Sequence, residues 1–512
     1  MNPISRRKFL ATSALSLAAT RLPAQSRSPI QANLAIPSEA PGPHIPADFV
    51  GLSYEVKELA NPEFFSAKNT GLIRAFKQIS PRGVLRLGGN TSEFGWWKPT
   101  PDSTEPEHPH TREVTGEPKA SYYAVTPQAI RNLTAFLEAT GWTCLYGINM
   151  GTNTPIRAAD EAEFVAKTLG SRLQYFQIGN EVNLFSRHLR DPRSWSAQTY
   201  LAEWLALARA IAARVRGARF GMPDVNDEIS WLPQIAATWG SVEYPPHVTT
   251  LSHHYYFGGP PSNPDVNISN LLKPATMVKV LGMADTAAAA AAKMGVRVRM
   301  TEGNTCYRGG KPGVSDVFAA ALWSADYSLL LAANNYSGIN LHGGTGPIIA
   351  SGLGGIMFGD QVLRDQGATP EQIATHPHAY YSPIAEFGST YVLEPVAYGL
   401  IFAGMLAGGT LIHADLTAKL QAAGINATAY AAKLSGGQTS VVVLNKDMEN
   451  DLALRMDFGS VRTGAVEIDT LSAPSLESRE AHLARAARSG RLKGGAINLT
   501  VPSASGLRVT IV

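Results

Sequence analysis

The chain has 512 residues, which is long for one compact domain, so its length predicts two or three domains. The hydrophobic fraction of 45% and the charged fraction of 17% allow a large core and exclude disorder as the general state. A formal net charge of +3 gives no electrostatic case for binding nucleic acid. The two cysteines, Cys144 and Cys306, cannot build a disulfide scaffold or a four-cysteine zinc site, and we expect them to be unpaired.

The first residues of the chain resemble an export signal. Arg6 and Arg7 precede Phe9 and a short apolar stretch, which is the pattern of a twin-arginine signal, and cleavage is expected after Ala24. A membrane span takes about 20 apolar residues, and no segment of the chain is that long and apolar. We therefore expect residues 1–24 to be removed and the mature protein to act in the periplasm or outside the cell, without stable membrane insertion. The alternative is a basic N-terminus of a cytoplasmic protein.

Strand-like and helix-like segments alternate through residues 45–394. Helix-like stretches lie at Gln128–Thr140, Glu161–Leu169, Ala197–Arg216 and Val314–Ala333, with apolar residues three and four positions apart. This alternation predicts a (β/α)8 barrel. No Gly-x-Gly-x-x-Gly turn follows a strand, which disfavours the alternative of a doubly wound open sheet. The eight predicted strands are Phe49–Glu55, Val84–Gly89, Thr143–Asn149, Tyr175–Glu181, Arg219–Val225, Val248–Tyr256, Val296–Glu302 and Ser337–Gly343.

The pattern changes at about Pro395. From there on, short strand-like runs are separated by turn residues, and no helix-length segment lies between most of them. This predicts a β-sandwich over residues 395–512. Within residues 25–44, the run Pro29–Ile36 is expected to add a strand to that sandwich. The predicted C-terminal strands are Thr428–Leu434, Thr439–Leu444, Ala465–Leu471, Ala496–Val501 and Leu507–Val512.

Two predicted barrel strands end in glutamate: the fourth in Asn180-Glu181 and the seventh in Glu302. Barrel active sites form at the carboxyl ends of the strands, and strands four and seven face each other across the mouth. Two carboxyls about 5 Å apart suit the retaining cleavage of a glycosidic bond, in which one protonates the leaving oxygen and the other attacks the anomeric carbon. The amide of Asn180 can hydrogen-bond a sugar hydroxyl. The alternative is that each glutamate only caps a helix or pairs with a surface arginine.

Three segments together resemble a known family. They are Gly179-Asn180-Glu181, His253-His254-Tyr255-Tyr256, and the run from Glu302 to Gly310. They resemble glycoside hydrolase family 79, which contains retaining β-glucuronidases and heparanases, and the resemblance extends from about residue 45 to the end. The acidic motifs are shared by many barrel glycosidases, whereas the His-His-Tyr-Tyr segment is more specific.

The resemblance implies roles for individual residues, and it implies no cofactor and no metal. Glu181 would be the acid/base and Glu302 the nucleophile. Tyr255 would hydrogen-bond the nucleophile and hold its orientation, with His253 on the same face of the strand. Sugar hydroxyls would be bound by Glu55, Asn90 and Asn180, and the uronic carboxylate by Tyr307, Gly309 and Tyr381.

Two features depart from the family pattern. Arg308 stands where heparanase-like sequences have glycine, and it would either contact the substrate's charge or point to solvent. The long stretch Gly343–Ala379 leaves the placement of Tyr381 open.

The sequence as a whole predicts an exported, retaining exo-β-glucuronidase that removes terminal β-D-glucuronic acid, with or without a 4-O-methyl group, from glycans or glycosides. One alternative is an endo-acting, heparanase-like enzyme. The other is a non-catalytic polysaccharide-binding protein, which would need neither glutamate.

Overall fold

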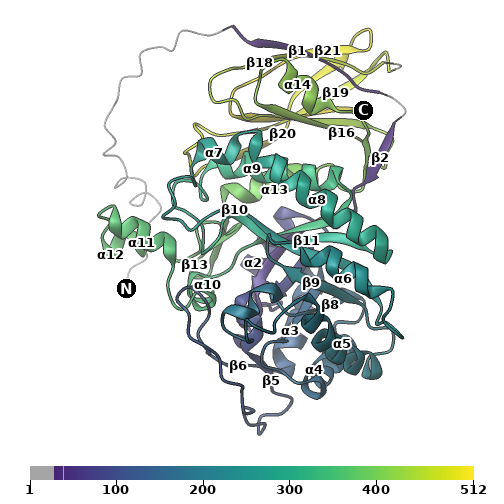
Figure 1. The fold of residues 1–512 in the computed structure, drawn as a ribbon. Helices are drawn as coiled ribbons and strands as arrows, with labels where there is room; N and C mark the ends of the chain where they lie inside the picture. The colour runs from purple at the N-terminus through teal and green to yellow at the C-terminus, as the bar shows by residue number, and fades with distance from the viewer. Residues whose placement is uncertain (1–27, 38–39, 460) are drawn as a thin grey trace.

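The computed structural model describes residues 28–37, 40–459 and 461–512, and the predicted export signal lies outside them. Eight parallel strands close into a barrel, and they are the eight predicted strands in chain order (Figure 1). The predicted barrel fold is confirmed. Its strands are β3 (Val50–Glu55), β4 (Val84–Gly88), β7 (Thr143–Ile148), β8 (Leu173–Ile178), β9 (Phe220–Val225), β10 (Val248–Gly258), β11 (Arg297–Cys306) and β12 (Tyr336–His342).

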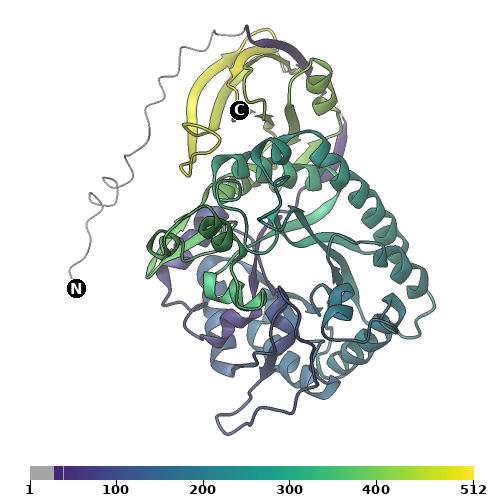
Figure 2. The same ribbon diagram turned by 60° about the vertical axis from the view of Figure 1, so that its left-hand side comes forward.

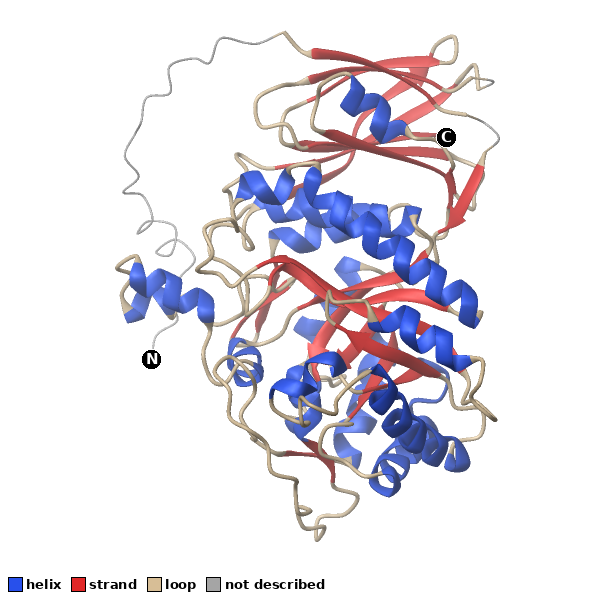
Figure 3. Ribbon diagram, in the orientation of Figure 1, coloured by secondary structure: helices blue, strands red, loops and turns tan. Residues whose placement is uncertain are grey.

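Helices surround the barrel (Figure 3). Local signals fix several of their ends: Pro127 begins α3, the Thr126 side chain caps it, and Gly141 ends it in a left-handed conformation. The main helices are α2 (Thr70–Ile79), α3 (Pro127–Thr140), α4 (Pro155–Leu169), α5 (Ala197–Arg214), α6 (Trp231–Trp239), α8 (Ala275–Met294), α9 (Phe318–Ala333) and α13 (Pro395–Gly404). Short elements between them are η1 (Val56–Ala60), η2 (Asn90–Phe94), β5 (Gly95–Trp97), β6 (Tyr123–Val125), η3 (Gly170–Arg172), η4 (Val182–Arg187) and α7 (Ile268–Leu272).

Helix α9 is apolar on nearly every side because the barrel, α13 and a sheet of the second domain all cover it. It begins at Phe318, four residues later than the predicted start at Val314. The preceding residues form a turn instead, in which the backbone N–H of Gly313 donates to the Asp316 carboxylate.

Two further sheets form a second domain that is stacked on one side of the barrel (Figure 2). The order of the larger sheet is β2 (Pro41–His44), β15 (Thr410–Ile412), β16 (Ala427–Lys433), β17 (Thr439–Asn445), β22 (Ser505–Ile511), β19 (Gly464–Ser472) and β20 (His482–Leu492). The smaller sheet contains β1 (Ile30–Ala35), β18 (Leu452–Asp457) and β21 (Ala496–Val501), and α14 (Leu416–Ala422) packs beside it.

Strand β17, in the middle of the larger sheet, is buried on both faces, which explains its continuous apolar run. Val441 and Val443 point into the core between the two sheets, whereas Val442 and Leu444 join the core of the barrel. Strand β1, at the position predicted for Pro29–Ile36, pairs with β18 in parallel. The second domain therefore contains both ends of the described chain.

The structure also differs from the sequence prediction after the barrel strands and in the second domain. Helix α13 packs against α9, so residues from Pro395 to Gly404 extend the barrel's helical layer and the β-rich region begins later, at Thr410. Strands β18 and β20 were not predicted, because charged residues interrupt both. The stretch after β12 forms α10 (Gly346–Gly352), α11 (Phe358–Asp365), α12 (Pro370–Ile373) and the hairpin of β13 (Ile384–Phe387) and β14 (Thr390–Leu393).

Both cysteines are buried and unpaired. None of the helices in the described part of the chain has the length and apolar character needed to cross a membrane.

Candidate active site

A cavity of about 500 Å³ opens at the carboxyl ends of the barrel strands. Its wall includes both predicted glutamates together with aromatic, acidic and basic side chains from the loops that follow the strands. The lining residues that come from barrel strands or closely follow them include Glu55, Asn90, Glu181, Asn226, His254, Tyr256, Glu302, Tyr307 and His342.

Glu181 and Glu302 are brought together as predicted. A carboxylate oxygen of Glu181 and a carboxylate oxygen of Glu302 lie within 4.8 Å of each other. Retaining glycosidases have their two carboxyl groups about 5 Å apart. Glu302 lies within β11 and is 6% exposed. Glu181 follows β8 and has a left-handed backbone with φ of 44°, an uncommon conformation for a side-chain-bearing residue.

A buried carboxylate holds the turn that presents Glu181. Glu93 Oε1 accepts a hydrogen bond from the backbone N–H of Asn180 at 2.8 Å. Its other oxygen accepts from the N–H groups of Met150 and Gly151, at the end of the neighbouring strand. Glu93 therefore ties the ends of β7 and β8 together and fixes the direction in which the chain leaves β8.

Polar contacts surround the Glu302 carboxylate. Arg86 donates to Oε2, the Tyr256 hydroxyl donates to Oε1 at 2.9 Å, and His342 Nδ1 lies 3.7 Å from Oε2. Burial raises the pKa of Glu302, but His342, His254 and Arg86 outweigh burial and lower it to about 2. Glu302 is therefore an ionised, firmly oriented carboxylate near neutral pH.

The environment of Glu181 has the opposite effect on its pKa. Burial raises the pKa of Glu181, and the negative charge of Glu302 raises it further, while the hydrogen bond from His254 Nδ1 at 3.2 Å opposes both. The pKa values of the two carboxyls are thus shifted in opposite directions, so that Glu181 favours the protonated form and Glu302 the ionised form. Such a separation is what an acid and a nucleophile need.

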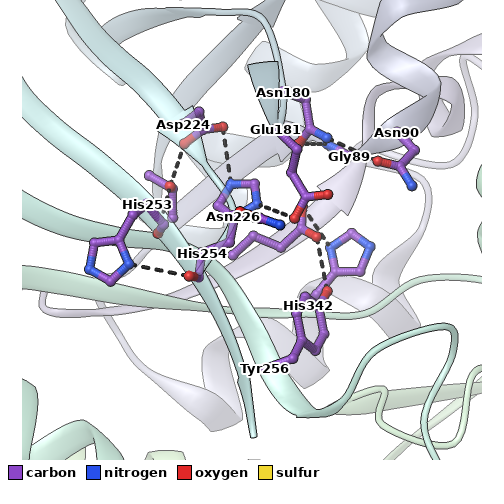
Figure 4. Close-up of polar contacts among 12 residues, drawn as sticks. Gly89, Asn90, Asn180, Glu181, Asp224, Asn226, His253, His254, Tyr256 and His342 are labelled. Carbon is purple, nitrogen blue, oxygen red and sulfur yellow. Dashed lines mark hydrogen bonds and ion pairs between the residues drawn. The ribbon is translucent and has the colours of Figure 1, made fainter. Parts of the chain in front are cut away.

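An ionic network beneath the carboxylates was not predicted from the sequence. Arg86 on β4 is fully buried and bonds Asp224 as well as Glu302, and it donates to Asn180 Oδ1 at 2.6 Å. The ring of His254 lies between Asp224 and Glu181, with Nε2 3.2 Å from the Asp224 carboxylate (Figure 4). Burial lowers the pKa of His254, but Asp224 and Glu302 overcome burial and raise it to about 10. His254 is therefore a cation that donates to both acids.

A glycine makes room for the buried guanidinium. A Cβ added at Gly88 would lie 2.1 Å from Cζ of Arg86, so a larger residue cannot stand there without displacing the arginine. Charged residues inside the apolar strand runs Val84–Gly88 and Phe220–Val225 were the signal that could have revealed Arg86 and Asp224.

The prediction for β10 is wrong by one residue. Tyr256, not Tyr255, donates to Glu302, and His254, not His253, faces the acids. The Tyr255 ring packs instead on Tyr327 of α9, and His253 Nε2 bonds the Tyr336 hydroxyl at 2.7 Å. Because side chains alternate between the two faces of a strand, an error of one position reverses every assignment.

The residues predicted to bind sugar hydroxyls lie together. Glu55 and Asn90 line the cavity, and Glu55 is oriented by hydrogen bonds from the N–H and hydroxyl of Thr91. Asn180 Nδ2 donates to Asn90 Oδ1 at 3.2 Å, while its own oxygen accepts from Arg86. Asn180 therefore orients Asn90 and lies outside the lining of the main cavity.

Two of the residues predicted to bind the uronic carboxylate, Tyr307 and Tyr381, lie beside Tyr256, with ring centroids 6.5 Å and 6.0 Å from its ring. Tyr307 is 38% exposed and Tyr381 is 3% exposed, and both line the cavity. The Gly309 carbonyl accepts from the N–H of Tyr380 at 2.8 Å, which brings Tyr381 to the site despite the long segment before it. Gly309 itself lies behind the wall, where a Cβ would be 2.3 Å from Sδ of Met357.

No family model matches the chain. It is 25% identical to a β-glucuronidase of Aspergillus niger over 358 residues, which are 63% of this chain and 62% of that protein. A β-glucuronidase of Neurospora crassa is 26% identical over 303 residues, covering 52% of this chain and 51% of that protein. The chain therefore spans less than two thirds of the curated relatives it matches.

Solved structures share the fold over nearly the whole chain. A 4-O-α-L-rhamnosyl-β-D-glucuronidase from Fusarium oxysporum, in complex with Rha-GlcA, has a TM-score of 0.69 at 16% identity and covers 94% of this chain and 100% of that chain. An α-L-arabinofuranosidase from Thermotoga maritima has a TM-score of 0.63 at 16% identity, covering 94% and 99%. Sequence similarity and shared fold thus both connect the chain to enzymes that hydrolyse glycosidic bonds.

Proposed function

We propose that the chain is a retaining β-glucuronidase of the family 79 type. The observation that carries the proposal is the pair Glu181 and Glu302, whose carboxylate oxygens lie within 4.8 Å and whose pKa values shift in opposite directions. Similarity to two β-glucuronidases supports glucuronides as the substrate class. A non-catalytic binding protein is disfavoured, because binding alone needs neither the ionised nor the protonated carboxyl.

The reaction would proceed in two displacements. In the first, the Glu302 carboxylate attacks the anomeric carbon while Glu181 gives its proton to the leaving oxygen. Burial is the main cause of the raised pKa of Glu181, and the charge of Glu302 adds to it; forming the ester removes that charge, which lowers the pKa of Glu181 and lets it act as a base. In the second, Glu181 takes a proton from water, which attacks the same carbon and releases the sugar. Arg86 and Tyr256 hold Glu302 in position throughout.

Three loops support exo action by meeting on one side of the cavity. The guanidinium of Arg308 lies 4.5 Å from the ring centroid of Phe358, and a Cβ at Gly116 would lie 2.6 Å from its Nη2. These residues come from three separate connections, after β5, β11 and β12. We infer that this contact restricts one end of the site, because an endo-acting, heparanase-like enzyme needs a cleft that is open at both ends. Export by the twin-arginine route, and hence action in the periplasm or outside the cell, stays a proposal resting on Arg6 and Arg7.

A substrate panel tests the proposed activity. Aryl β-glucuronide, β-glucoside and β-xyloside with the same leaving group, and a heparan oligosaccharide, would be incubated with the protein and the products followed by mass. We expect release of glucuronic acid from the aryl glucuronide. Its kcat/KM should exceed that of the glucoside by about 10⁴-fold, because the glucoside would leave the polar groups that bind the carboxylate without a partner. Comparable rates on the two substrates would contradict the specificity, and internal cleavage of the oligosaccharide would contradict exo action.

The pH profile should reflect the two opposite pKa shifts. Glu302, with its pKa lowered to about 2, stays ionised through the acid range, so kcat/KM should not fall on that account down to about pH 4. Glu181 must be protonated in the first step, so kcat/KM should fall as pH rises past its raised pKa. This alkaline limb should be nearly absent with a dinitrophenyl glucuronide, whose leaving group needs no proton. An alkaline limb that is equal for both leaving groups would contradict the assignment of Glu181.

The two neighbouring tyrosines of β10 provide a matched pair of variants. Tyr256→Phe removes the hydroxyl that donates to Glu302 and should lower kcat by about 10- to 100-fold, as expected for one donor to a reacting carboxylate. Tyr255→Phe removes the same atom on the opposite face and should stay within about threefold of wild type. Steady-state kinetics on an aryl β-glucuronide would measure both. A larger loss in Tyr255→Phe would restore the original assignment.

A further inference from the structure

The charges on the cavity wall are almost completely paired. Glu302 is bonded by Arg86, and Glu181 is contacted by His254. Glu55 accepts two hydrogen bonds from Thr91. The acidic lining residues are Glu55, Glu117, Glu181, Asp227 and Glu302, and the Lys and Arg lining residues are Arg187, Lys279 and Arg308.

Two of the three basic side chains already have acidic partners. Lys279 Nζ lies 2.6 Å from Asp227 Oδ2, and Arg187 Nη1 lies 2.8 Å from Glu117 Oε1. Within residues 28–37, 40–459 and 461–512, no carboxylate oxygen lies within 4.0 Å of the Arg308 guanidinium. Arg308 is therefore the one lysine or arginine of the described wall whose charge is not offset by a neighbouring acid.

The guanidinium of Arg308 is also held in place. Its backbone has φ of 62°, an uncommon left-handed conformation for a residue that carries a side chain. The group is stacked 4.5 Å from the ring centroid of Phe358, and the absence of a side chain at Gly116 leaves the space that it occupies. A guanidinium that lies over an aromatic ring can still donate hydrogen bonds from the N–H groups at its edge. A carboxylate matches this planar fork with two parallel hydrogen bonds.

We propose that Arg308 forms the anion subsite of this cavity and selects a uronic acid over the corresponding neutral sugar. The inference rests on the proposed function and deepens it, since it assigns the substrate's carboxylate to a residue that is particular to this chain. The neighbouring hydroxyl of Tyr307 lines the same part of the wall. With Arg187 and Lys279 neutralised by their partners, the wall offers one anion site, which fits one carboxylate and not the many charges of a sulfated chain.

The test compares three proteins on two substrates. Wild type, Arg308→Gln and Arg308→Lys would be assayed on aryl β-glucuronide and aryl β-glucoside with the same leaving group. Arg308→Gln should lower kcat/KM on the glucuronide by about 100-fold, mainly through KM, and stay within about threefold on the glucoside. Arg308→Lys keeps the positive charge but loses the planar pair of N–H donors, so its kcat/KM on the glucuronide should fall by about 10-fold. Arg214→Gln, on the exposed face of α5, is the control for loss of an arginine and should change neither rate.

A binding measurement makes the test independent of turnover. Calorimetric titration with D-glucuronate and D-glucose should show preference for glucuronate in wild type and loss of that preference in Arg308→Gln. Equal losses on both substrates would mean that Arg308 only joins the loops, and unchanged selectivity would also overturn the proposal. If wild type binds glucuronate through Arg308 but cleaves no glycoside, the proposed function fails and the anion subsite stands.

Discussion

Replacing Glu302 by alanine is expected to lower kcat on an aryl β-glucuronide by about 10⁵-fold, because the group that forms the covalent intermediate is gone. Azide should enter the vacated space, attack the anomeric carbon from the same face and give the α-glycosyl azide. Glu161→Gln is a suitable control. Glu161 is another buried glutamate, on α4, and it bonds only the hydroxyl of Tyr146 and lies outside the cavity.

Replacing Glu181 by alanine should give the complementary result. A dinitrophenyl glucuronide needs little protonation, so the intermediate should still form in a rapid burst, and the second step should stall without its base. Azide should then intercept the intermediate and give the β-glycosyl azide. Opposite anomers from the two variants, measured by NMR of the isolated azides, are required by the assignment. The reverse pairing of anomers would exchange the two roles, and rapid unaided turnover in either variant would place the reacting acids elsewhere.

Removing Arg86 should have the largest effect on stability. Arg86→Met would leave the carboxylates of Asp224 and Glu302 without the cation that both contact, in a site where all three side chains are nearly inaccessible to water. Breaking a buried ion pair on one side typically costs about 3–5 kcal/mol, so we expect a strongly lowered unfolding temperature and loss of activity.

Two further variants make that result interpretable. The double variant Arg86→Met/Asp224→Asn also removes the negative charge of Asp224, which Arg86→Met leaves unpaired. Its unfolding temperature should therefore be higher than that of Arg86→Met, although its activity should not return. Arg214→Met removes an exposed ion pair and should cost no more than about 1 kcal/mol. Thermal unfolding followed by circular dichroism would compare them. An Arg86→Met protein as stable as Arg214→Met would mean that the network does not hold the barrel mouth together.

The barrel and its two glutamates could be predicted because their signals are local. Each barrel strand contains a short apolar run; Glu181 follows β8, and Glu302 lies in the carboxyl-terminal half of β11, and both line the cavity. Strand order was therefore enough to predict that these two glutamates lie together at the cavity.

The face of β10 could not be read in the same way. In His253-His254-Tyr255-Tyr256 each residue type occurs once on each face, so both registers place a histidine and a tyrosine toward the site. Tertiary contacts distinguish them: Tyr255 packs on Tyr327 and His253 bonds Tyr336, whereas Tyr256 bonds Glu302 and His254 bonds Glu181. Composition carries no information about this choice.

The ionic network was missed for a different reason. A charged residue in a sequence ordinarily indicates solvent, whereas Arg86 and Asp224 stabilise each other across the inside of the barrel, 138 residues apart. The contact between Arg308 and Phe358 beside the cavity was missed for the same reason. It joins two segments that follow different strands, and no periodic pattern in the sequence indicates it. Such contacts depend on tertiary structure alone.

The stereochemistry of hydrolysis tests the central claim most directly, because it depends on both carboxyls and on their separation. Wild-type protein would be mixed with an aryl β-glucuronide, and the anomeric proton of the first-formed glucuronic acid would be followed by NMR before mutarotation. With Glu181 and Glu302 oxygens within 4.8 Å of each other, there is no room for water between them, and the β-anomer should appear first. Initial formation of the α-anomer would show a single displacement by water and would contradict the assignment of Glu302 as the nucleophile.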